Sequence, residues 1–321
     1  MPTASRQASP NRAWILIAFA CVYLFWGSTF LAIRYGLEEL PPFVIASTRF
    51  LLSGAILLAV CAIRGMRMWP SAREFGMLAM IGVLMLGCGN SAILWSELYL
   101  STGLVSLLVA SIPLFAALIE SFLPNGEGLP IRGWTGVAIG FIGLAFLVLP
   151  SLRDSLQGDS RQIIATAVIL GGSFCWTAGS VISRRSTIRI SGFAAAGWQM
   201  FFGGIFNTGL MFAAGGYRGS HWGLEAWTSL LYLVTFGSLI GYTAYIYLLN
   251  NVAVSKVTTY AYVNPVIAVI LGAIFLRERF VLVEYIGMAS ILLAVFLVTS
   301  SKLKTGAAPA EVKDIAVGRK S

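Results

Sequence analysis

Two tryptophans lie in the middle of long apolar stretches, where an aromatic side chain could bind a solute. Trp26 and Trp176 each precede an arginine by eight residues, Arg34 and Arg184. Both lie too deep for the membrane interface, where tryptophans concentrate. Aromatic faces turned inward suit amphipathic or aromatic solutes, and the face of an indole ring attracts an amine. Packing against neighbouring helices is the alternative explanation of both residues.

A second group of polar side chains lies in the ninth apolar stretch of the chain. It contains Thr259, Tyr260, Tyr262 and Asn264, and it ends at Pro265. Proline has no N–H and clashes with the preceding turn, so it leaves one backbone carbonyl free to bind a ligand or water. Polar groups inside a membrane are costly to bury without a partner or a function. We therefore predict that this group contacts a solute.

Pro113 repeats this arrangement in the first half of the chain, next to Ser111. Helices interrupted at corresponding positions in two halves indicate the binding site of a transporter. Kinks that serve only helix packing are the alternative. Four further side chains are weaker candidates for solute binding, and they lie in the third and eighth apolar stretches: Asn90, Trp95, Tyr242 and Tyr245.

Two carboxylates, Glu97 and Glu120, could titrate within apolar stretches. A proton-coupled transporter needs such a group, exposed alternately to the two sides of the membrane. Both residues lie near the ends of their stretches, where a solvated carboxylate is unremarkable. Proton coupling through either one is therefore a hypothesis.

Arg49 lies about six residues into the second apolar stretch, roughly 9 Å along a helix. A guanidinium at this depth can extend to the outer surface or bind carbonyl groups between helices. Gln199 occupies the matching position in the second half. We therefore expect a structural hydrogen-bonding role at both positions.

These residues need membrane-spanning helices to position them, and the composition predicts such helices. Hydrophobic residues make up 58% of the chain, charged residues make up 11%, and the mean hydropathy is +0.83. A soluble domain carries about 25% charged residues. The expected fold is therefore an all-α integral membrane protein. Ten apolar runs, each about 20 residues long and able to cross a bilayer, predict transmembrane helices at 13–33, 43–63, 74–97, 100–123, 131–150, 162–183, 193–214, 226–249, 253–276 and 280–300.

The chain contains an internal repeat of about half its length. Gly89 lies 24 residues before Pro113, as Gly241 lies 24 residues before Pro265, and corresponding residues are 150 to 152 positions apart. We expect a first five-helix repeat over 13–150 and a second over 162–300, between a polar N-terminal tail (1–12) and a disordered basic C-terminal tail (302–321). Because five is odd, the second repeat must be inverted relative to the first. Paired repeats typically enclose a substrate site.

The distribution of Lys and Arg predicts the orientation. If the N-terminus is cytoplasmic, 14 of the 22 basic residues lie in cytoplasmic segments, 6 lie outside and 2 lie within spans. Cytoplasmic loops carry an excess of Lys and Arg. Both termini are therefore expected in the cytoplasm. The same distribution explains the net charge of +9 without a nucleic-acid partner.

Several motifs resemble those of a known family. The runs Trp26-Gly27-Ser28-Thr29 and Ser111-Ile112-Pro113 resemble the first half of a ten-helix drug/metabolite transporter. The run from Tyr260 to Val269 resembles the signature of the EamA-type branch, and Tyr247-Leu248-Leu249-Asn250 is similar to the YedA-like exporters. The resemblance implies a bacterial inner-membrane protein that exports small metabolites through a central cavity. It does not supply a substrate, because the superfamily spans amino acids, sugars, nucleotide conjugates and drugs.

We therefore expect a secondary transporter that exports amino acids or amphipathic or aromatic amines by alternating access of two inverted repeats. The alternative is a translocator of a lipid or lipid-linked sugar with the same fold, for which Arg49 would be a headgroup ligand. An enzyme is disfavoured, because His221 is the only histidine and acid–base or metal chemistry needs clustered polar groups. No cofactor or metal is expected. The expected partners are a small solute and membrane lipid, and the expected state is a monomer or a homodimer.

Overall fold

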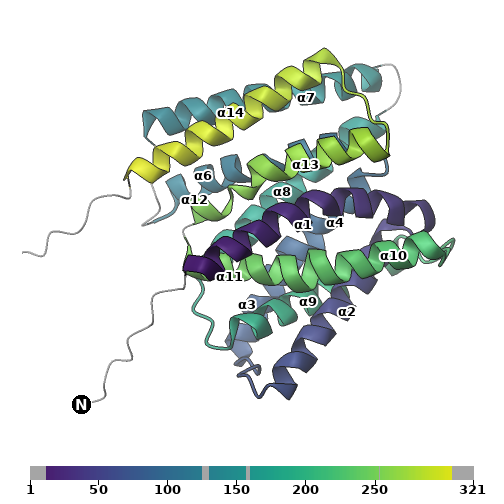
Figure 1. The fold of residues 1–321 in the computed structure, drawn as a ribbon, viewed down its shortest axis with the longest axis vertical. Helices are drawn as coiled ribbons and strands as arrows, with labels where there is room; N and C mark the ends of the chain where they lie inside the picture. The colour runs from purple at the N-terminus through teal and green to yellow at the C-terminus, as the bar shows by residue number, and fades with distance from the viewer. Residues whose placement is uncertain (1–11, 125–129, 157–159, 253, 306–321) are drawn as a thin grey trace, which may run out of the picture.

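The computed structural model describes residues 12–124, 130–156, 160–252 and 254–305, and within these ranges all regular structure is helical. Ten helical segments follow one another along the chain (Figure 1). The polar tail expected at 1–12 lies outside the described residues except for Arg12, which begins α1. Most of the tail expected at 302–321 also lies outside them, although α14 continues to Thr305.

The ten segments correspond one by one to the ten expected spans. Four of them contain an internal change of helix type or a break, and their parts are joined by "with" in the following list. They are α1 (Arg12–Glu39), α2 (Pro42–Ile63), α3 (Ala72–Gly82) with η1 (Val83–Gly89) and α4 (Asn90–Ser96), α5 (Thr102–Val109) with α6 (Ile112–Phe122), α7 (Ile131–Leu156), α8 (Arg161–Arg185), α9 (Gly192–Ala213), α10 (Leu224–Tyr232) with η2 (Leu233–Tyr242) and α11 (Thr243–Asn251), α12 (Val254–Val257) with α13 (Tyr260–Phe275), and α14 (Leu282–Thr305).

Seven segments are long and apolar enough to cross a membrane: α1, α2, α3 to α4, α5 to α6, α7, α8 and α10 to α11. Two shorter apolar stretches, Val263–Phe275 and Leu282–Val298, lie in α13 and α14. The remaining segment, α9, carries the polar side chains of Gln199 and Asn207 and packs along α2. These helices confirm the expected all-α membrane fold.

The packing of the helices repeats when the two halves are exchanged. The first helix of the first half, α1, packs against α10, η2, α11 and α13, whereas α8 packs against η1, α4, α5 and α6. Two further pairs are each made of corresponding helices: α2 with α9, and α7 with α14, which lie side by side in Figure 1. Five crossings in each half turn the second half over, which gives the inverted repeat that the sequence predicts. Which end faces the cytoplasm stays a prediction.

Two corresponding arginines tie helix ends together. Arg34 Nη1, near the end of α1, donates to the backbone oxygen of Glu97 at 2.6 Å, just after α4. Arg184 Nη1, near the end of α8, donates to the backbone oxygen of Leu249 at 2.9 Å, in the last turn of α11. The last carbonyls of a helix have no partner within it, and a nearby cation is favourable there. These arginines therefore stabilise the scaffold at opposite ends of the two repeats.

The two prolines do not interrupt their helices in the same way. Pro113 lies in the first turn of α6, directly after a break between Val109 and Ile112. The corresponding break in the second half falls between Val257 and Tyr260, and Pro265 lies inside α13. Proline fits a first helical turn because the N–H that it lacks has no helical partner there. The sequence predicts that each proline interrupts its helix at a matching place. In the structure the break in the second half comes before Pro265 and not at it.

Both halves contain a π-helical segment that the sequence did not predict. The first, η1, begins at Val83, and the second, η2, begins 150 residues later at Leu233. Each lies inside the third helix of its repeat. Segments of π-helix are rare and occur often at functional sites. Their corresponding positions indicate that each half needs a widened turn at the same depth.

Gly82→Ala is expected to destabilise the protein, because α3 and α9 approach closely at this glycine. A Cβ at Gly82 would overlap the carbonyl oxygen of Gln199, a backbone atom that cannot rotate away. Overpacking of this kind costs about 1–3 kcal/mol. The measurement is the melting temperature of the detergent-solubilised protein. Gly76→Ala is the matched control, because Gly76 lies on the same helix with open space around it. Equal melting temperatures of the two variants would contradict this account.

Candidate functional site

A small cavity lies between the two halves of the protein, and its volume is about 50 Å³. A water molecule needs about 10–15 Å³ of such space, so this conformation has room for a few waters. A larger solute requires the surrounding helices to move apart. Both halves contribute to the lining, which consists of Trp26, Thr29, Phe30, Arg49, Phe50, Leu86, Asn90, Ile93, Val109, Ile112, Trp176, Gly237, Tyr242, Tyr260 and Asn264.

A cluster of five aromatic rings forms one wall of this cavity. The ring centre of Trp26 lies 5.4 Å from that of Trp176, 5.0 Å from Tyr245 and 5.3 Å from Tyr260. The pairs with Trp176 and Tyr260 are edge-to-face, an arrangement that aromatic quadrupoles favour. Tyr242 lies 6.3 Å from Trp176. Four of the rings line the cavity, and Tyr245 is fully buried behind them.

The two tryptophans occupy corresponding positions but use their indole N–H groups differently. Trp26 Nε1 donates to the carbonyl oxygen of Gly237 in η2 at 3.0 Å. In η1 the carbonyl oxygen of Leu86, one residue before the counterpart of Gly237, accepts from Asn207 Nδ2 at 3.1 Å. Both bonds satisfy a π-helical carbonyl from a neighbouring helix. The donor to η1 is therefore Asn207 and not Trp176, and the buried Nε1 of Trp176 has no hydrogen-bond partner in the described chain.

Two asparagines also line the cavity. With its amide oriented to suit its neighbours, Asn264 Nδ2 donates to the backbone oxygens of Tyr23 at 3.0 Å and Tyr260 at 3.3 Å. The bond to Tyr23 ties α13 to α1, and the bond to Tyr260 lies within α13. Asn90 Oδ1 is buried, and no described residue donates a hydrogen bond to it. Asn90 therefore presents a free acceptor, whereas Asn264 is held by the scaffold.

The structure places the other predicted residues away from the cavity. Trp95 lines a separate apolar hollow of about 430 Å³ beside η1, α8 and α9. Thr259 Oγ1 shares a hydrogen bond with Tyr23 Oη at 2.6 Å. Ser111 is buried in the break before α6 and is not among the residues that line the cavity. Pro113 and Pro265 are not among them either. The side chain of Tyr262 lies outside the described part of the structure.

Arg49 is the charged residue among those that line the cavity. The sequence predicts a structural hydrogen-bonding role for it. Its side chain donates from Nε to Ser238 Oγ at 2.8 Å, and its Cζ lies 4.9 Å from the ring centre of Phe50. Arg49 is only 3% exposed, so the guanidinium does not extend to the surface. Gln199 keeps a structural contact, because its Oε1 accepts from Tyr242 Oη at 2.7 Å. The position of Arg49 deep in an apolar helix is the sequence feature that indicates a cavity residue, because such cations usually face a site or a path inside the protein.

Glu97 lies one helical turn beyond the cavity along α4. Asn90, Ile93 and Glu97 follow the spacing i, i+3 and i+7, so they share one helix face. Glu97 is fully buried, and neither of its carboxylate oxygens has a hydrogen-bond partner among the described residues. The charges of Arg34 and Glu278 act on it from nearby. The carboxylate of Glu278 is occupied, since it accepts from the backbone N–H groups at the start of α5.

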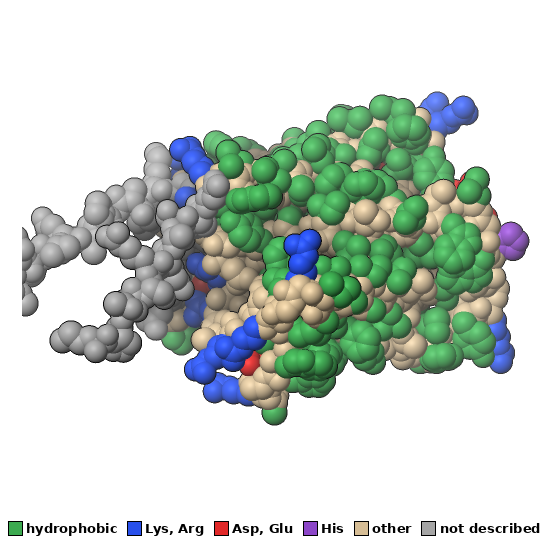
Figure 2. All heavy atoms as spheres, turned by 60° about the horizontal axis from the view of Figure 1, so that its bottom comes forward, with side chains coloured by type: hydrophobic (Ala, Val, Ile, Leu, Met, Phe, Trp, Pro, Cys, Tyr) green, Lys and Arg blue, Asp and Glu red, His purple; other side chains and the backbone are tan. Residues whose placement is uncertain are grey.

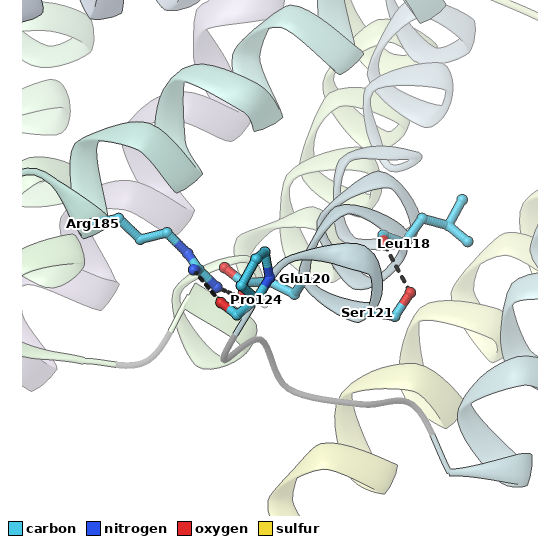
Figure 3. A network of polar contacts seen from close by, with 5 residues as sticks. All are labelled: Leu118, Glu120, Ser121, Pro124 and Arg185. Carbon is cyan, nitrogen blue, oxygen red and sulfur yellow. Dashed lines mark hydrogen bonds and ion pairs between the residues drawn. The ribbon is translucent and has the colours of Figure 1, made fainter.

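Glu120 differs from Glu97 because it has a partner. Figure 3 shows Arg185 of α8 reaching Glu120 of α6, with 2.8 Å between Arg185 Nη2 and Glu120 Oε2. Arg185 Nη1 also donates to the carbonyl oxygen of Pro124 at 3.0 Å. This network links the two halves at one end of the molecule. It makes Glu120 a structural residue in this conformation.

Glu120→Gln is expected to change little. Ion pairs that are partly open to solvent contribute about 0–1 kcal/mol, and the glutamine can still accept a hydrogen bond from Arg185. We expect the melting temperature to fall by a few degrees at most and the pH dependence of transport to stay as in the wild type. Transport by reconstituted protein, measured at several pH values, checks the second point. A lost pH dependence would show that Glu120 titrates during transport.

Two inverted five-helix repeats that enclose a buried polar and aromatic cavity define a membrane transporter. Residues 13–149 and 163–300 each match the model of the EamA-like transporter family. The chain belongs to this family, as the sequence motifs predicted.

Similar proteins include the uncharacterized inner membrane transporter YedA of Escherichia coli K12, which is 35% identical over 295 residues, or 91% of this chain and 92% of YedA. The uncharacterized transporter YvbV of Bacillus subtilis is 25% identical over 94% of this chain and 97% of its own length. A WAT1-related chloroplastic protein of Arabidopsis thaliana is 26% identical, over 86% of this chain and 67% of its own. The likeness to YedA confirms the predicted branch and a multi-pass location in the inner membrane.

A solved crystal structure shows the same fold. It superposes with a TM-score of 0.66 over 92% of this chain and 99% of its own, at 18% sequence identity. At this identity the likeness concerns the helix arrangement alone.

Proposed function

We propose that this chain is a secondary transporter that exports small metabolites across the inner membrane by alternating access. One observation carries the proposal: both repeats line the same buried cavity, and its wall combines aromatic rings with polar atoms that have no hydrogen-bond partner in the described part of the chain. Mid-membrane sites between inverted repeats suit alternating access, because rocking one repeat against the other opens the site to each side in turn.

The helices around the cavity provide points at which such a movement can occur. The breaks before α6 and α13 and the π-helical segments η1 and η2 all lie beside it. At one end the Arg185–Glu120 ion pair links the halves, and at the other end Glu278 caps α5 from the opposite half. Transport requires the contacts at one end to open while those at the other end stay closed. The small cavity volume supports a conformation in which neither end is wide open.

The orientation is part of the proposal, with both termini in the cytoplasm. Figure 2 shows hydrophobic side chains over the broad middle of one face, with Lys and Arg side chains gathered mainly toward the left end of the view. Cytoplasmic ends of membrane proteins carry such an excess of cations. We assign the more basic end to the cytoplasm.

Efflux from proteoliposomes tests the proposed function. Vesicles that contain the purified protein are loaded with labelled amino acids or aromatic amines, and efflux is measured with and without a pH gradient. We expect efflux of at least one class above that of protein-free vesicles. Efflux of no compound in a panel of small metabolites would overturn the proposal.

The alternative of lipid translocation receives less support from the structure. The apolar hollow beside Trp95 could accept acyl chains, but none of the described residues that line it is charged. A phospholipid headgroup would find no cation there. A fluorescent-lipid scrambling assay on the same vesicles separates the two functions, because lipid movement without solute efflux would favour the alternative.

A further inference from the structure

We propose that Arg49 binds a carboxylate group of the transported solute, so that the site takes aromatic or apolar carboxylates, amino acids included, in preference to simple amines. This inference rests on the proposed transport function and names the substrate class of the central cavity. It begins from the charge of that cavity. Arg49 is the charged residue among the lining residues, and in the described part of the chain it forms no ion pair.

The guanidinium is buried with part of its hydrogen-bonding capacity unused. Arg49 Nε is bonded to Ser238, whereas Nη1 is buried and has no hydrogen-bond partner in the described structure. A guanidinium has five N–H donors, arranged as a planar fork that matches a carboxylate. A buried charge without a partner is costly. A solute carboxylate would remove this cost each time it binds, whereas a cationic amine would add to it.

The two repeats differ at this position, since only the first carries a charge there. Gln199 occupies the position of Arg49 in the second half, and it accepts a hydrogen bond from Tyr242 that joins two helices. The same helix position can thus be filled by an uncharged amide. The charge at Arg49 is therefore available for the solute.

Other free polar atoms around the cavity suit the same ligand. Trp176 Nε1 is a buried donor with no hydrogen-bond partner among the described residues, and it can bind a second carboxylate oxygen. Asn90 Oδ1 is a buried acceptor to which none of the same residues donates, so it can bind an N–H or O–H group of the solute. The aromatic wall of Trp26, Tyr242 and Tyr260 then receives the apolar part. In this arrangement an amino group is accepted beside the carboxylate but is not required.

A basic hollow separate from the central cavity supports the same charge preference. A hollow of about 640 Å³ opens between α3, α8 and the segment that follows α8, and it is lined by Arg67, Arg73, Arg185 and Arg189 together with one carboxylate, Glu74. Glu74 is engaged by the backbone of Ser71 and Arg189. Clustered cations raise the local concentration of anions. A solute with a carboxylate would therefore be attracted toward the protein at this end.

Three probes built on the same phenethyl skeleton test the inference. They are 3-phenylpropionate with only the carboxylate, phenylalanine with both groups, and phenethylamine with only the amine. Ligand-induced thermal stabilisation of the detergent-solubilised protein reports their binding, since a ligand that binds the folded state raises the melting temperature. We expect both carboxylates to stabilise the wild type and phenethylamine to bind at least 10-fold more weakly.

Substitutions of cavity residues test whether the probes bind in the central cavity. Arg49→Gln is expected to weaken binding of the carboxylates by about 30-fold or more, the size seen when a buried charge partner is removed, and Arg49→Lys is expected to recover part of it. Trp176→Phe keeps the ring and loses only the free N–H, so we expect a several-fold loss. Arg218→Gln, at an exposed arginine, is the matched control. If Arg49→Gln does not fold, as judged by size-exclusion chromatography, the three probes on the wild type and Trp176→Phe decide.

The result that overturns the inference is phenethylamine binding as tightly as the carboxylates, or carboxylates binding Arg49→Gln as they bind the wild type. Binding of none of the three probes also counts against it. These failures differ from failure of the proposed function. A protein that exports other solutes from vesicles but binds no carboxylate keeps the function and loses the substrate class, whereas a protein that exports nothing loses both.

Discussion

Trp26→Ala is expected to reduce transport by about 100-fold or more while the protein still folds. The indole of Trp26 contacts three other rings and donates the hydrogen bond that satisfies the carbonyl of Gly237 in η2. Each aromatic pair contributes about 0.5–1.5 kcal/mol, and a buried carbonyl left without its donor costs about 1–3 kcal/mol. Together these terms come to at least about 2.5 kcal/mol, which corresponds to a population of the binding-competent cavity that is roughly 100-fold smaller.

A second substitution separates the two contributions of this side chain. Trp26→Phe keeps an aromatic ring in the cavity and loses the N–H that holds η2. We expect its transport to lie between those of the wild type and Trp26→Ala. If the two variants transport equally poorly, the hydrogen bond to Gly237 is the dominant contribution.

Initial efflux rates from proteoliposomes, at matched protein content, provide the measurement. Trp14→Ala is the control, because Trp14 lies on the same helix and is 60% exposed. Wild-type rates for Trp26→Ala would contradict the assignment of the aromatic cluster to the solute site.

Glu97→Gln is expected to remove the stimulation of export by a pH gradient while export down the solute gradient continues. The carboxylate is fully buried, and no described residue donates a hydrogen bond to it. It lies about 10 Å beyond Asn90, as seven residues of helical rise imply. A carboxylate in this setting gains or loses a proton when the path opens to water. The amide of glutamine cannot do so, and it has nearly the same shape as the protonated acid.

The sign of the effect follows from this chemistry. Inward movement of a proton from the outside drives export only if Glu97 is protonated on one side and deprotonated on the other. We therefore expect wild-type efflux to rise when the outside is more acidic, and efflux by Glu97→Gln to be the same in both conditions. Glu120→Gln serves as the matched carboxylate control, because its ion pair with Arg185 accounts for its position. Gradient-stimulated efflux by Glu97→Gln would rule out Glu97 as the coupling residue.

Local patterns in the sequence determined the architecture of this protein. The ten helices follow from runs of apolar residues, because a bilayer leaves a long apolar segment no other way to satisfy its backbone groups. The two-repeat plan follows from the constant offset between pairs such as Trp26 and Trp176. Trp26, Trp176, Tyr242, Tyr260, Asn90 and Asn264 could all be proposed for the cavity, because deep polar and aromatic side chains are rare where they serve no purpose.

Other features were decided only by the tertiary structure. Trp95 and Asn90 lie five residues apart on the same helix, so their side chains point about 140° apart. Only the neighbouring helices decide that Asn90 faces the cavity and Trp95 the apolar hollow. The π-helical turns have no sequence pattern of their own, since their freed carbonyls are satisfied by Trp26 and Asn207 from distant parts of the chain. Glu120 and Glu97 look alike in sequence, and only the approach of Arg185 distinguishes them. The cavity position of Arg49 has the same origin. Its distance from the surface, and the lack of a counter-ion for it among the described residues, are properties of the packed helices.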